Sequence, residues 1–307
     1  MARVLFAKGA RGEIVKKLQG RLLASGFDPH GIDGDYGKNT ERAVTAFRRA
    51  SALAPGGEVD VQTWRRLMPR RIPSVRDRCL QLTAAFEGHG FTLVQGNYDG
   101  AGLTWGIIGF TLRYGGISKL VLQAHARDPD LVRRAFGRKT DELLRMMRAP
   151  QAEQLAWADR ISIGASKARV REPWRSGFRR FGELEEVQAL QTHLADASYF
   201  QPAVRSAREL GLTTELGLAL AFDIHVQNGG ISSSARTVIR NEVAEHPLAR
   251  ERELRTIIAN AIADASRPRF REDVRARKLT IAAGAGKVHG ASYVLRNWGL
   301  DDVRVRA

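Results

Sequence analysis

The sequence has only one cysteine, Cys79, among its 307 residues. An intramolecular disulfide framework and a zinc site built from several cysteines are therefore excluded, and we expect Cys79 to be a buried core thiol rather than a nucleophile. Long apolar runs are also missing, since a bilayer span needs about 20 residues. The run near the start, Val4 to Ala7, is too short for a signal peptide, so we expect neither an export signal nor stable insertion into a membrane.

Acidic residues are scarce relative to basic ones. The sequence has 33 Asp and Glu against 49 Lys and Arg, a formal net charge of +16. This balance favours an anionic partner, which can be nucleic acid, an acidic membrane surface or the polyanionic envelope of a bacterial cell. Basic clusters such as Arg179-Arg180 are not accompanied by a recognition motif, so we expect no nucleic-acid partner. The seven histidines form no H-E-x-x-H pair, so we expect neither a metal nor a cofactor.

A hydrophobic fraction of 43% and a charged fraction of 27% are typical of folded proteins, and the length suggests two domains. Helical spacing of apolar residues predicts a first helix over 12–25, a second capped by Asn39 and a third capped by Asp60. After the third helix, a segment rich in proline and charged residues indicates a linker between two domains. We therefore predict a three-helix domain over 1–69, a linker over 70–76 and a larger domain over 77–307.

The first domain contains a recognisable series of residues: Ile32-Asp33-Gly34-Asp35-Tyr36-Gly37, Thr40, Ala43-Val44, Phe47, Val59-Asp60, Thr63-Trp64 and Leu67. In these residues it resembles the three-helix peptidoglycan-binding domain of cell-wall hydrolases. The resemblance implies that peptidoglycan is a partner. Without it, the segment is a small helical bundle of any purpose. The aspartates of the turn do not have the spacing of a calcium loop, so we expect them to stabilise the turn.

Glu87 lies at the end of a helix expected over 75–86, just before Gly88. The negative end of the helix dipole disfavours a carboxylate there, and this suits a group that donates a proton near neutral pH. The alternative is an exposed helix-end residue without a catalytic role.

Asp99 lies in a turn-rich segment between two expected strands, 91–94 and 103–110. Hydrolysis of a glycosidic bond needs two carboxylates with separate roles on either side of the sugar. A helix-end Glu87 opposite a sheet-borne Asp99 fits that need, although Asp99-Gly100 is also a common hairpin turn.

The larger domain contains Phe86-Glu87, the run from Tyr98 to Phe110, Tyr199 to Ala203, Ala221-Phe222-Asp223 and Asn228-Gly229-Gly230. In these segments, and more loosely in Arg277-Lys278-Leu279 and Ala283-Gly284, it resembles the inverting chitosanases of glycoside hydrolase family 46, which belong to the lysozyme superfamily. The resemblance implies a mainly α protein, with a lysozyme-like α+β domain that carries a small β-sheet at the active-site cleft.

Carried over residue by residue, Glu87 matches the general acid of the family and Asp99 its general base. Thr104 matches the threonine that helps to hold the attacking water, although it can also be a plain strand residue. The interval from Glu87 to Asp99 is shorter than in typical chitosanases. We therefore expect the loop over the cleft to differ from that of typical chitosanases, which leaves the identity of the substrate open.

A helix expected over 215–227 is apolar nearly all round and should be buried. Its Asp223 then needs a partner, for which Arg271, Arg275 and Arg277 are candidates. We predict that four residues support the cleft or contact the substrate there: Asp223, Asn228, Arg271 and Arg277. Asp223 serves either as structural support or as a modulator of the catalytic carboxylates.

Joining the two resemblances, we expect a monomeric peptidoglycan hydrolase that cleaves β-1,4 glycosidic bonds, as a muramidase. This suits a phage endolysin, held in the host cytoplasm until a holin opens the membrane to the periplasm and cell wall. The alternatives are a chitosanase acting on chitosan and a non-catalytic wall-binding or phage structural protein. The global charge disfavours chitosan, which is itself a polycation.

Overall fold

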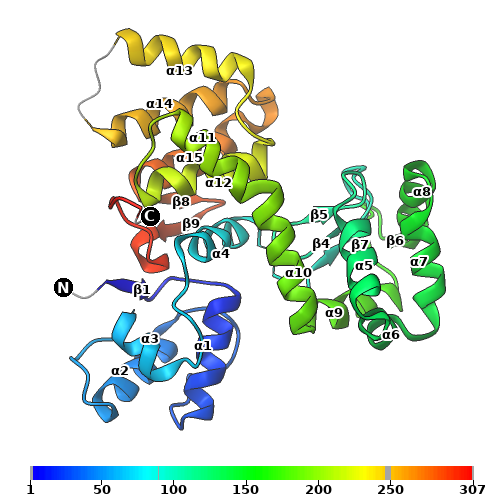
Figure 1. Ribbon diagram of the computed structural model, residues 1–307, viewed down its shortest axis with the longest axis horizontal. Coiled ribbons are helices and arrows are strands. Elements are labelled where there is room, and N and C mark those ends of the chain that lie inside the picture. Colours follow the sequence, from blue (N-terminus) through cyan, green and yellow to red (C-terminus); the bar gives the residue numbers. More distant parts are fainter. Residues whose placement is uncertain (1–2, 89, 246–249, 306–307) are drawn as a thin grey trace. The chain divides into compact units, whose positions relative to one another are not determined.

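A computed structural model describes residues 3–88, 90–245 and 250–305 (Figure 1). The chain divides into two compact units, one made of residues 1–86 with 198–307 and the other of residues 87–197. None of the helices in the described ranges has the length and apolar character to cross a membrane. The compact units describe which residues lie close together in space and do not test where the domains begin and end along the chain. The domain boundaries at 1–69 and 77–307 therefore remain a prediction.

The three predicted N-terminal helices are present as α1 (Glu13–Ala24), α2 (Lys38–Ala50) and α3 (Val61–Leu67). Asp60 caps α3 as predicted, since its side chain accepts from the Thr63 backbone N–H at 2.7 Å. Asn39 does not cap α2, which begins at Lys38 after Gly37; Asn39 lies inside the helix, and its side chain accepts from Arg42 at 3.1 Å. A short antiparallel pair, β1 (Val4–Phe6) with β2 (Val59–Asp60), was not predicted.

The N-terminal strand packs against the C-terminal 3₁₀-helix η4 (Leu295–Trp298) within the first unit (Figure 1). The Ala7 N–H donates to the Asn297 carbonyl at 3.0 Å, and the Asn297 side chain donates to the Lys8 carbonyl at 2.7 Å. Gln81 of α4 (Val75–Glu87) accepts from the Ile14 backbone N–H at 3.1 Å, which satisfies a donor at the start of α1. The three-helix region is therefore attached by hydrogen bonds as well as by the connecting chain.

The connecting segment is itself held in place. The Trp64 indole N–H donates to the carbonyls of Arg70 and Arg71 at 3.1 and 3.2 Å. The Ser74 backbone N–H donates to the Asp77 carboxylate at 2.9 Å, just before α4 begins. These bonds restrict the segment at both ends.

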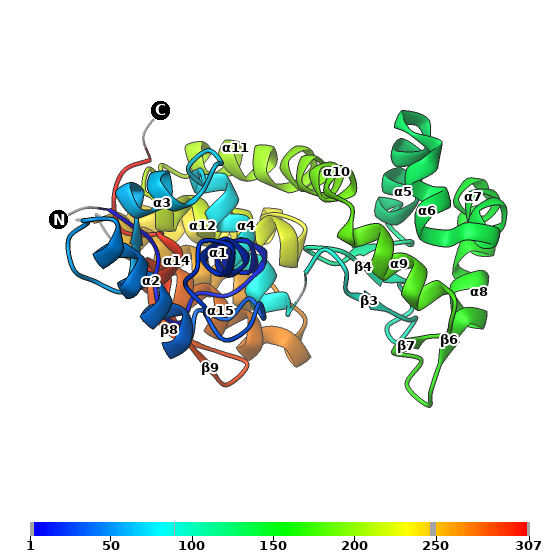
Figure 2. The ribbon, with the colours of Figure 1, turned by 90° about the horizontal axis from the view of Figure 1, so that it is seen from below.

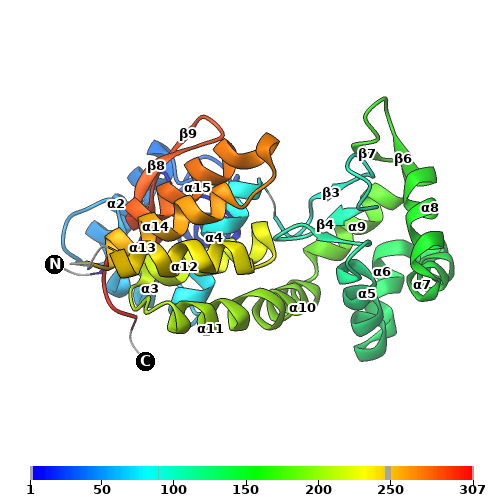
Figure 3. The same ribbon diagram turned by 90° about the horizontal axis from the view of Figure 1, so that it is seen from above.

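The rest of the first unit is a helical layer around α12 (Figures 2 and 3). It contains α4 (Val75–Glu87, whose last residue belongs to the second unit), α11 (Gln201–Glu209), α12 (Glu215–Asn228), α13 (Ser233–Glu245), α14 (Glu251–Asp264), η3 (Pro268–Phe270), α15 (Arg271–Ala283) and the hairpin β8 (Ala285–Val288) and β9 (Ala291–Val294). Helices α11, α14 and α15 all pack on α12. The first ten residues of α12 are buried, as its apolar sequence predicts.

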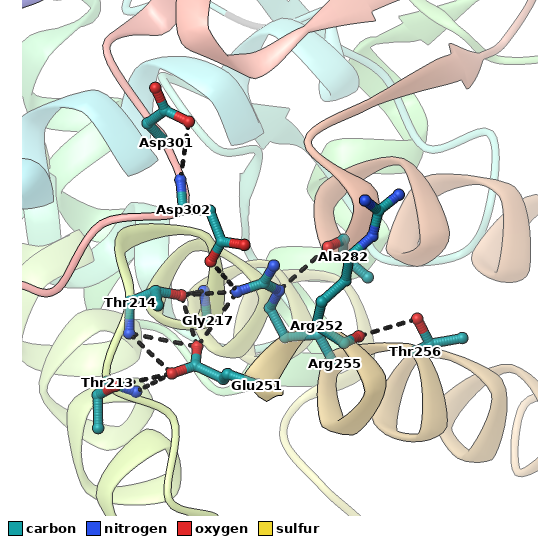
Figure 4. Close-up of polar contacts among 10 residues, drawn as sticks. All are labelled: Thr213, Thr214, Gly217, Glu251, Arg252, Arg255, Thr256, Ala282, Asp301 and Asp302. Carbon is teal, nitrogen blue, oxygen red and sulfur yellow. Dashed lines mark hydrogen bonds and ion pairs between the residues drawn. The ribbon is translucent and has the colours of Figure 1, made fainter. Parts of the chain in front are cut away.

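The start of α12 is fixed by a buried arginine network, drawn in Figure 4. The Thr214 hydroxyl accepts from the Gly217 N–H at 3.1 Å and from Arg255 at 2.8 Å. Arg255 is completely buried and also donates to Asp302 at 2.7 Å. Glu251 accepts from the Thr214 backbone N–H at 3.1 Å. The network ties α14 and the C-terminal segment to the helix that carries Asp223.

The second unit combines short strands with helices. Its three-stranded antiparallel sheet has the order β3 (Val94–Gln95), β4 (Thr104–Trp105) and β5 (Phe110–Thr111), and a hairpin joins β6 (Ser162–Ile163) to β7 (Arg169–Val170). The helices are α5 (Gly116–Arg127), α6 (Pro129–Phe136), η1 (Gly137–Lys139), α7 (Thr140–Arg148), α8 (Gln151–Ile161), α9 (Trp174–Glu183) and α10 (Glu185–Ala195), followed by η2 (Asp196–Phe200). The strands are shorter than predicted, and a turn at Gly106 to Gly109 divides the segment 103–110 into two.

Aromatic packing forms the core beneath the three-stranded sheet. Trp105 of β4 is fully buried and stacks on Phe181, with ring centroids 5.4 Å apart and planes 16° apart. Its indole N–H donates to the Phe178 carbonyl at 3.1 Å. Because a buried indole N–H needs an acceptor, this bond orients the ring and fixes β4 against α9.

Candidate active site

Glu87 ends α4, as predicted, and its side chain is half-buried. The turn of the helix before it is held tightly. The Phe86 ring lies 4.7 Å from the Tyr293 ring and 5.0 Å from the Arg277 guanidinium carbon. The Tyr293 hydroxyl donates to the Ala85 carbonyl at 3.2 Å. These contacts fix the end of the helix that carries the carboxylate.

Asp99 lies in the loop between β3 and β4 and is exposed. Its carboxylate accepts from the Ala101 N–H at 2.9 Å, which makes a local turn. Asn97 closes the same loop, since its side-chain oxygen accepts from the Gly102 N–H at 2.9 Å and its amide donates to Asp159 at 3.3 Å. The loop therefore presents Asp99 to solvent on a hydrogen-bonded frame.

Gly96 brings this loop against the β6–β7 hairpin. Its N–H donates to the Ala168 carbonyl at 2.9 Å, and a Cβ at this position would lie 2.2 Å from the Lys167 carbonyl oxygen. Only glycine permits that approach. The Ser162 hydroxyl then accepts from the Asn97 backbone N–H at 2.9 Å, so the hairpin anchors the base of the Asp99 loop.

Tyr98 connects the two candidate carboxylates electrostatically. Burial raises the pKa of the Tyr98 phenol, and the negative charges of Asp99 and then Glu87 raise this pKa further. Exposed charges act over short distances in salt solution. The charges of the helix-end and loop carboxylates therefore both act on the Tyr98 phenol, although they come from different elements of the chain.

Thr104 begins β4, where it pairs with Gln95 on one side and Thr111 on the other. The residue is 6% exposed. Its hydroxyl has no hydrogen-bond partner among the residues that the structure describes, which leaves it available to a water molecule.

Asp223 is completely buried on α12 and does have a charged partner, as predicted. Arg277 donates to it from Nη2 at 2.7 Å and from Nε at 2.9 Å. Lys278 donates at 2.6 Å and Thr83 of α4 at 3.0 Å. Burial alone raises the pKa of a carboxyl, but the two cations hold the pKa of Asp223 well below its usual range.

The other predicted support residues do not join this cluster. Arg271 and Arg275 lie beside Asp264, at 4.0 and 2.6 Å, so the prediction that either can pair with Asp223 is wrong. Asn228 ends α12, and its amide donates to the Ser266 hydroxyl at 3.4 Å. These side chains stabilise the joints between α12, α14 and α15.

Sequence reasoning did not single out Asn97 as part of the loop frame or Lys278 as a partner of Asp223. Lys278 directly follows Arg277 in the sequence. Once Arg277 is taken as the partner of the buried Asp223, nothing in the sequence indicates that the aspartate has a second cationic partner. Asn97 had a usable signal, because asparagine in a Gly-rich turn often accepts from nearby backbone N–H groups.

The sequence raised the question of two further kinds of functional group, a reactive cysteine and a metal-binding cluster. Cys79 is buried, and burial raises the pKa of its thiol far above the usual value, so it is unsuited to nucleophilic attack. Across residues 3–88, 90–245 and 250–305, no group of three or more His, Cys, Asp or Glu side chains is placed to hold a metal ion.

The mainly α, lysozyme-like α+β fold and the family model that it matches place the chain in the glycoside hydrolase class. Residues 83–253, more than half of the chain, match the model of glycosyl hydrolase family 46, and the chain belongs to this family.

Residues 11–67 match the model of a putative peptidoglycan binding domain, so the chain has both predicted modules. Among curated proteins, the chain is 39% identical over 56 residues to a probable N-acetylmuramoyl-L-alanine amidase of Bacillus licheniformis, and 42% identical over 55 residues to N-acetylmuramoyl-L-alanine amidase CwlL of the same species. These matches cover 18% and 17% of this chain, and the chain spans only 16% and 15% of the length of these relatives.

Solved structures agree on the fold. A family 46 chitosanase of Gynuella sunshinyii in complex with chitotetraose has a TM-score of 0.51 and 17% identity, covering 74% of this chain and 99% of its own. A second chitosanase complex has a TM-score of 0.51 and 22% identity, covering 71% of this chain and 95% of its own. The predicted fold class is thereby confirmed.

Proposed function

We propose that the protein hydrolyses β-1,4 glycosidic bonds in the glycan strands of peptidoglycan. The observation that carries this proposal is the combination, in one chain, of a peptidoglycan-binding domain with a family 46 domain that has Glu87 at a helix end and Asp99 in a sheet loop. The first module supports the choice of polymer and the second supports the chemistry.

In the proposed mechanism Glu87 is the general acid. It gives its proton to the glycosidic oxygen as the bond to the anomeric carbon breaks. Asp99 takes a proton from a water molecule that attacks the opposite face of the sugar, with the Thr104 hydroxyl holding that water. One water is consumed, one new reducing end forms with inverted configuration, and the two carboxyl groups exchange their protonation states before the next cycle.

We place the cleavage at the bond from N-acetylmuramic acid to N-acetylglucosamine, which makes the protein a muramidase. A wall-binding module joined to a glycan hydrolase suits a bacteriolytic enzyme, and our proposal extends to a phage endolysin that reaches the wall from the host cytoplasm after a holin has opened the membrane. Co-expression with and without a holin tests this role, since rapid lysis should require both proteins.

Charge supports an anionic substrate over chitosan. The net charge of +16 repels a polycation, whereas the stem peptides of peptidoglycan carry carboxylates. A second candidate, chitosanase activity, is favoured by the family and by the names of the two structural neighbours.

The test compares reducing ends released from purified sacculi and from chitosan under the same conditions. Release from sacculi, with little from chitosan, supports the proposal. Release from chitosan alone supports the second candidate. Binding to sacculi without release of reducing ends from either polymer overturns both and identifies a binding protein.

A further inference from the structure

Arg113 follows β5 and lies on the Asp99 loop. Its guanidinium donates to the Gly100 carbonyl from Nη2 at 2.7 Å and from Nε at 3.0 Å, and its backbone N–H donates to the Ala101 carbonyl at 3.0 Å. The cation is therefore fixed at the residue directly after the proposed general base.

This guanidinium is exposed and still has capacity to bind. Nη1 has no hydrogen-bond partner and Arg113 forms no ion pair within the described ranges, whereas Arg133, Lys139 and Lys167 of the same unit each contact a carboxylate. The neighbouring residue, Tyr114, is 84% exposed and presents an aromatic ring to solvent. A fixed cation beside an exposed ring suits a sugar that carries a carboxylate.

We propose that Arg113 is a specificity-determining residue that selects a carboxylate-bearing glycan over a cationic one. The inference rests on the proposed role of Asp99. The anionic Asp99 would by itself attract the ammonium groups of glucosamine units, and a guanidinium fixed on the adjacent carbonyl offsets that attraction. The same guanidinium has N–H donors for the carboxylate of a lactyl group or stem peptide.

The test measures kcat/KM on three soluble glycans that differ in charge: peptidoglycan strands with their peptides, neutral N-acetylglucosamine oligomers and cationic glucosamine oligomers. Arg113→Gln keeps a donor for Gly100 but removes the charge. We expect it to lower the ratio of anionic to cationic kcat/KM about tenfold. Arg113→Lys should retain most of the ratio, and high salt should reduce the difference between Arg113→Gln and the wild type.

Arg127→Gln is the matched control. It removes the same charge from the far end of α5, about 16 Å along the helix from Gly116, and should leave the ratio unchanged. An equal loss on all three glycans in Arg113→Gln would overturn the inference, because it would show that Arg113 only holds the loop.

A failure of the inference about Arg113 can be distinguished from a failure of the proposed function. If the wild type does not cleave peptidoglycan, the proposed function fails, and the ratio of neutral to cationic kcat/KM still tests Arg113. If no glycan is cleaved, the affinities of the wild type and Arg113→Gln for the anionic and cationic oligomers, measured by calorimetry, decide the inference. Unchanged relative affinities would overturn it.

Discussion

Arg277 binds Asp223 through two nitrogens, with Nη2 at 2.7 Å and Nε at 2.9 Å, and both side chains are at most 1% exposed. The same guanidinium lies 5.0 Å from the Phe86 ring, one residue before Glu87. A buried ion pair therefore connects α12 and α15 to the end of α4. The pair packs against the last turn of the helix that carries the proposed general acid.

Asp223→Asn should lower the free energy of unfolding by about 3–5 kcal/mol, because it removes a buried negative charge that accepts hydrogen bonds from both Arg277 and Lys278. Urea unfolding followed by circular dichroism measures this loss. The control is Asp301→Asn, at an exposed residue 3.9 Å from Arg296, which should change stability by less than about 0.5 kcal/mol. Equal stability of the two variants would contradict the assigned role.

The acid sensitivity of the fold should depend on Asp223. Its pKa is far below the usual value in the folded protein, so the carboxylate stabilises the fold above its unfolded pKa of about 3.9, and this contribution is lost as the pH falls through the folded pKa. Stability of the wild type should therefore decline more steeply below pH ~4 than that of Asp223→Asn. Parallel curves of unfolding free energy against pH would refute this.

Asn97→Ala should reduce kcat about tenfold or more, because the Asp99 loop loses its bond to Gly102 and a small displacement of a reacting group is costly. Stability should fall by only about 1–2 kcal/mol. Steady-state kinetics and a thermal melt separate the two effects. Asn39→Ala, on the exposed face of α2, serves as the control and should change neither quantity noticeably.

Thr104→Val should lower kcat by about 100-fold, because valine has no hydroxyl to hold the attacking water, while the thermal midpoint should change little, because the Thr104 hydroxyl has no hydrogen-bond partner to lose among the described residues. Thr104→Ser keeps the hydroxyl and should retain most of the activity. If Thr104→Val remains fully active, Thr104 is only a strand residue and the water must be held elsewhere.

Local patterns predicted much of the fold. Apolar periodicity located α1 and α12, and side-chain chemistry located the Asp60 cap, because these features depend on residues close together in the sequence. The requirement that a buried charge be paired predicted that Asp223 has an arginine partner. It did not show which of the three candidate arginines is that partner, since the choice of Arg277 depends on how α15 packs on α12.

Long-range contacts had no comparable signal. The bonds from Ala7 and Lys8 to Asn297 join positions at opposite ends of the chain, and no periodic pattern indicates them. Arg113 also had no signal in the sequence, because its proposed role comes from its hydrogen bonds to the carbonyl of Gly100, 13 residues earlier in the chain. The candidate carboxylates were found through family resemblance, whereas the frame that positions them needed the structure.

The most direct test of the account is the digestion of purified sacculi by the wild type and by Glu87→Gln, followed by borohydride reduction and mass spectrometry of the released fragments. We predict muropeptides with reduced muramic acid ends from the wild type and none from Glu87→Gln, which should still sediment with sacculi and melt at the same temperature. Equal release by both proteins would contradict the role of Glu87, and reduced glucosamine ends or anhydro-muramic ends would contradict the muramidase assignment.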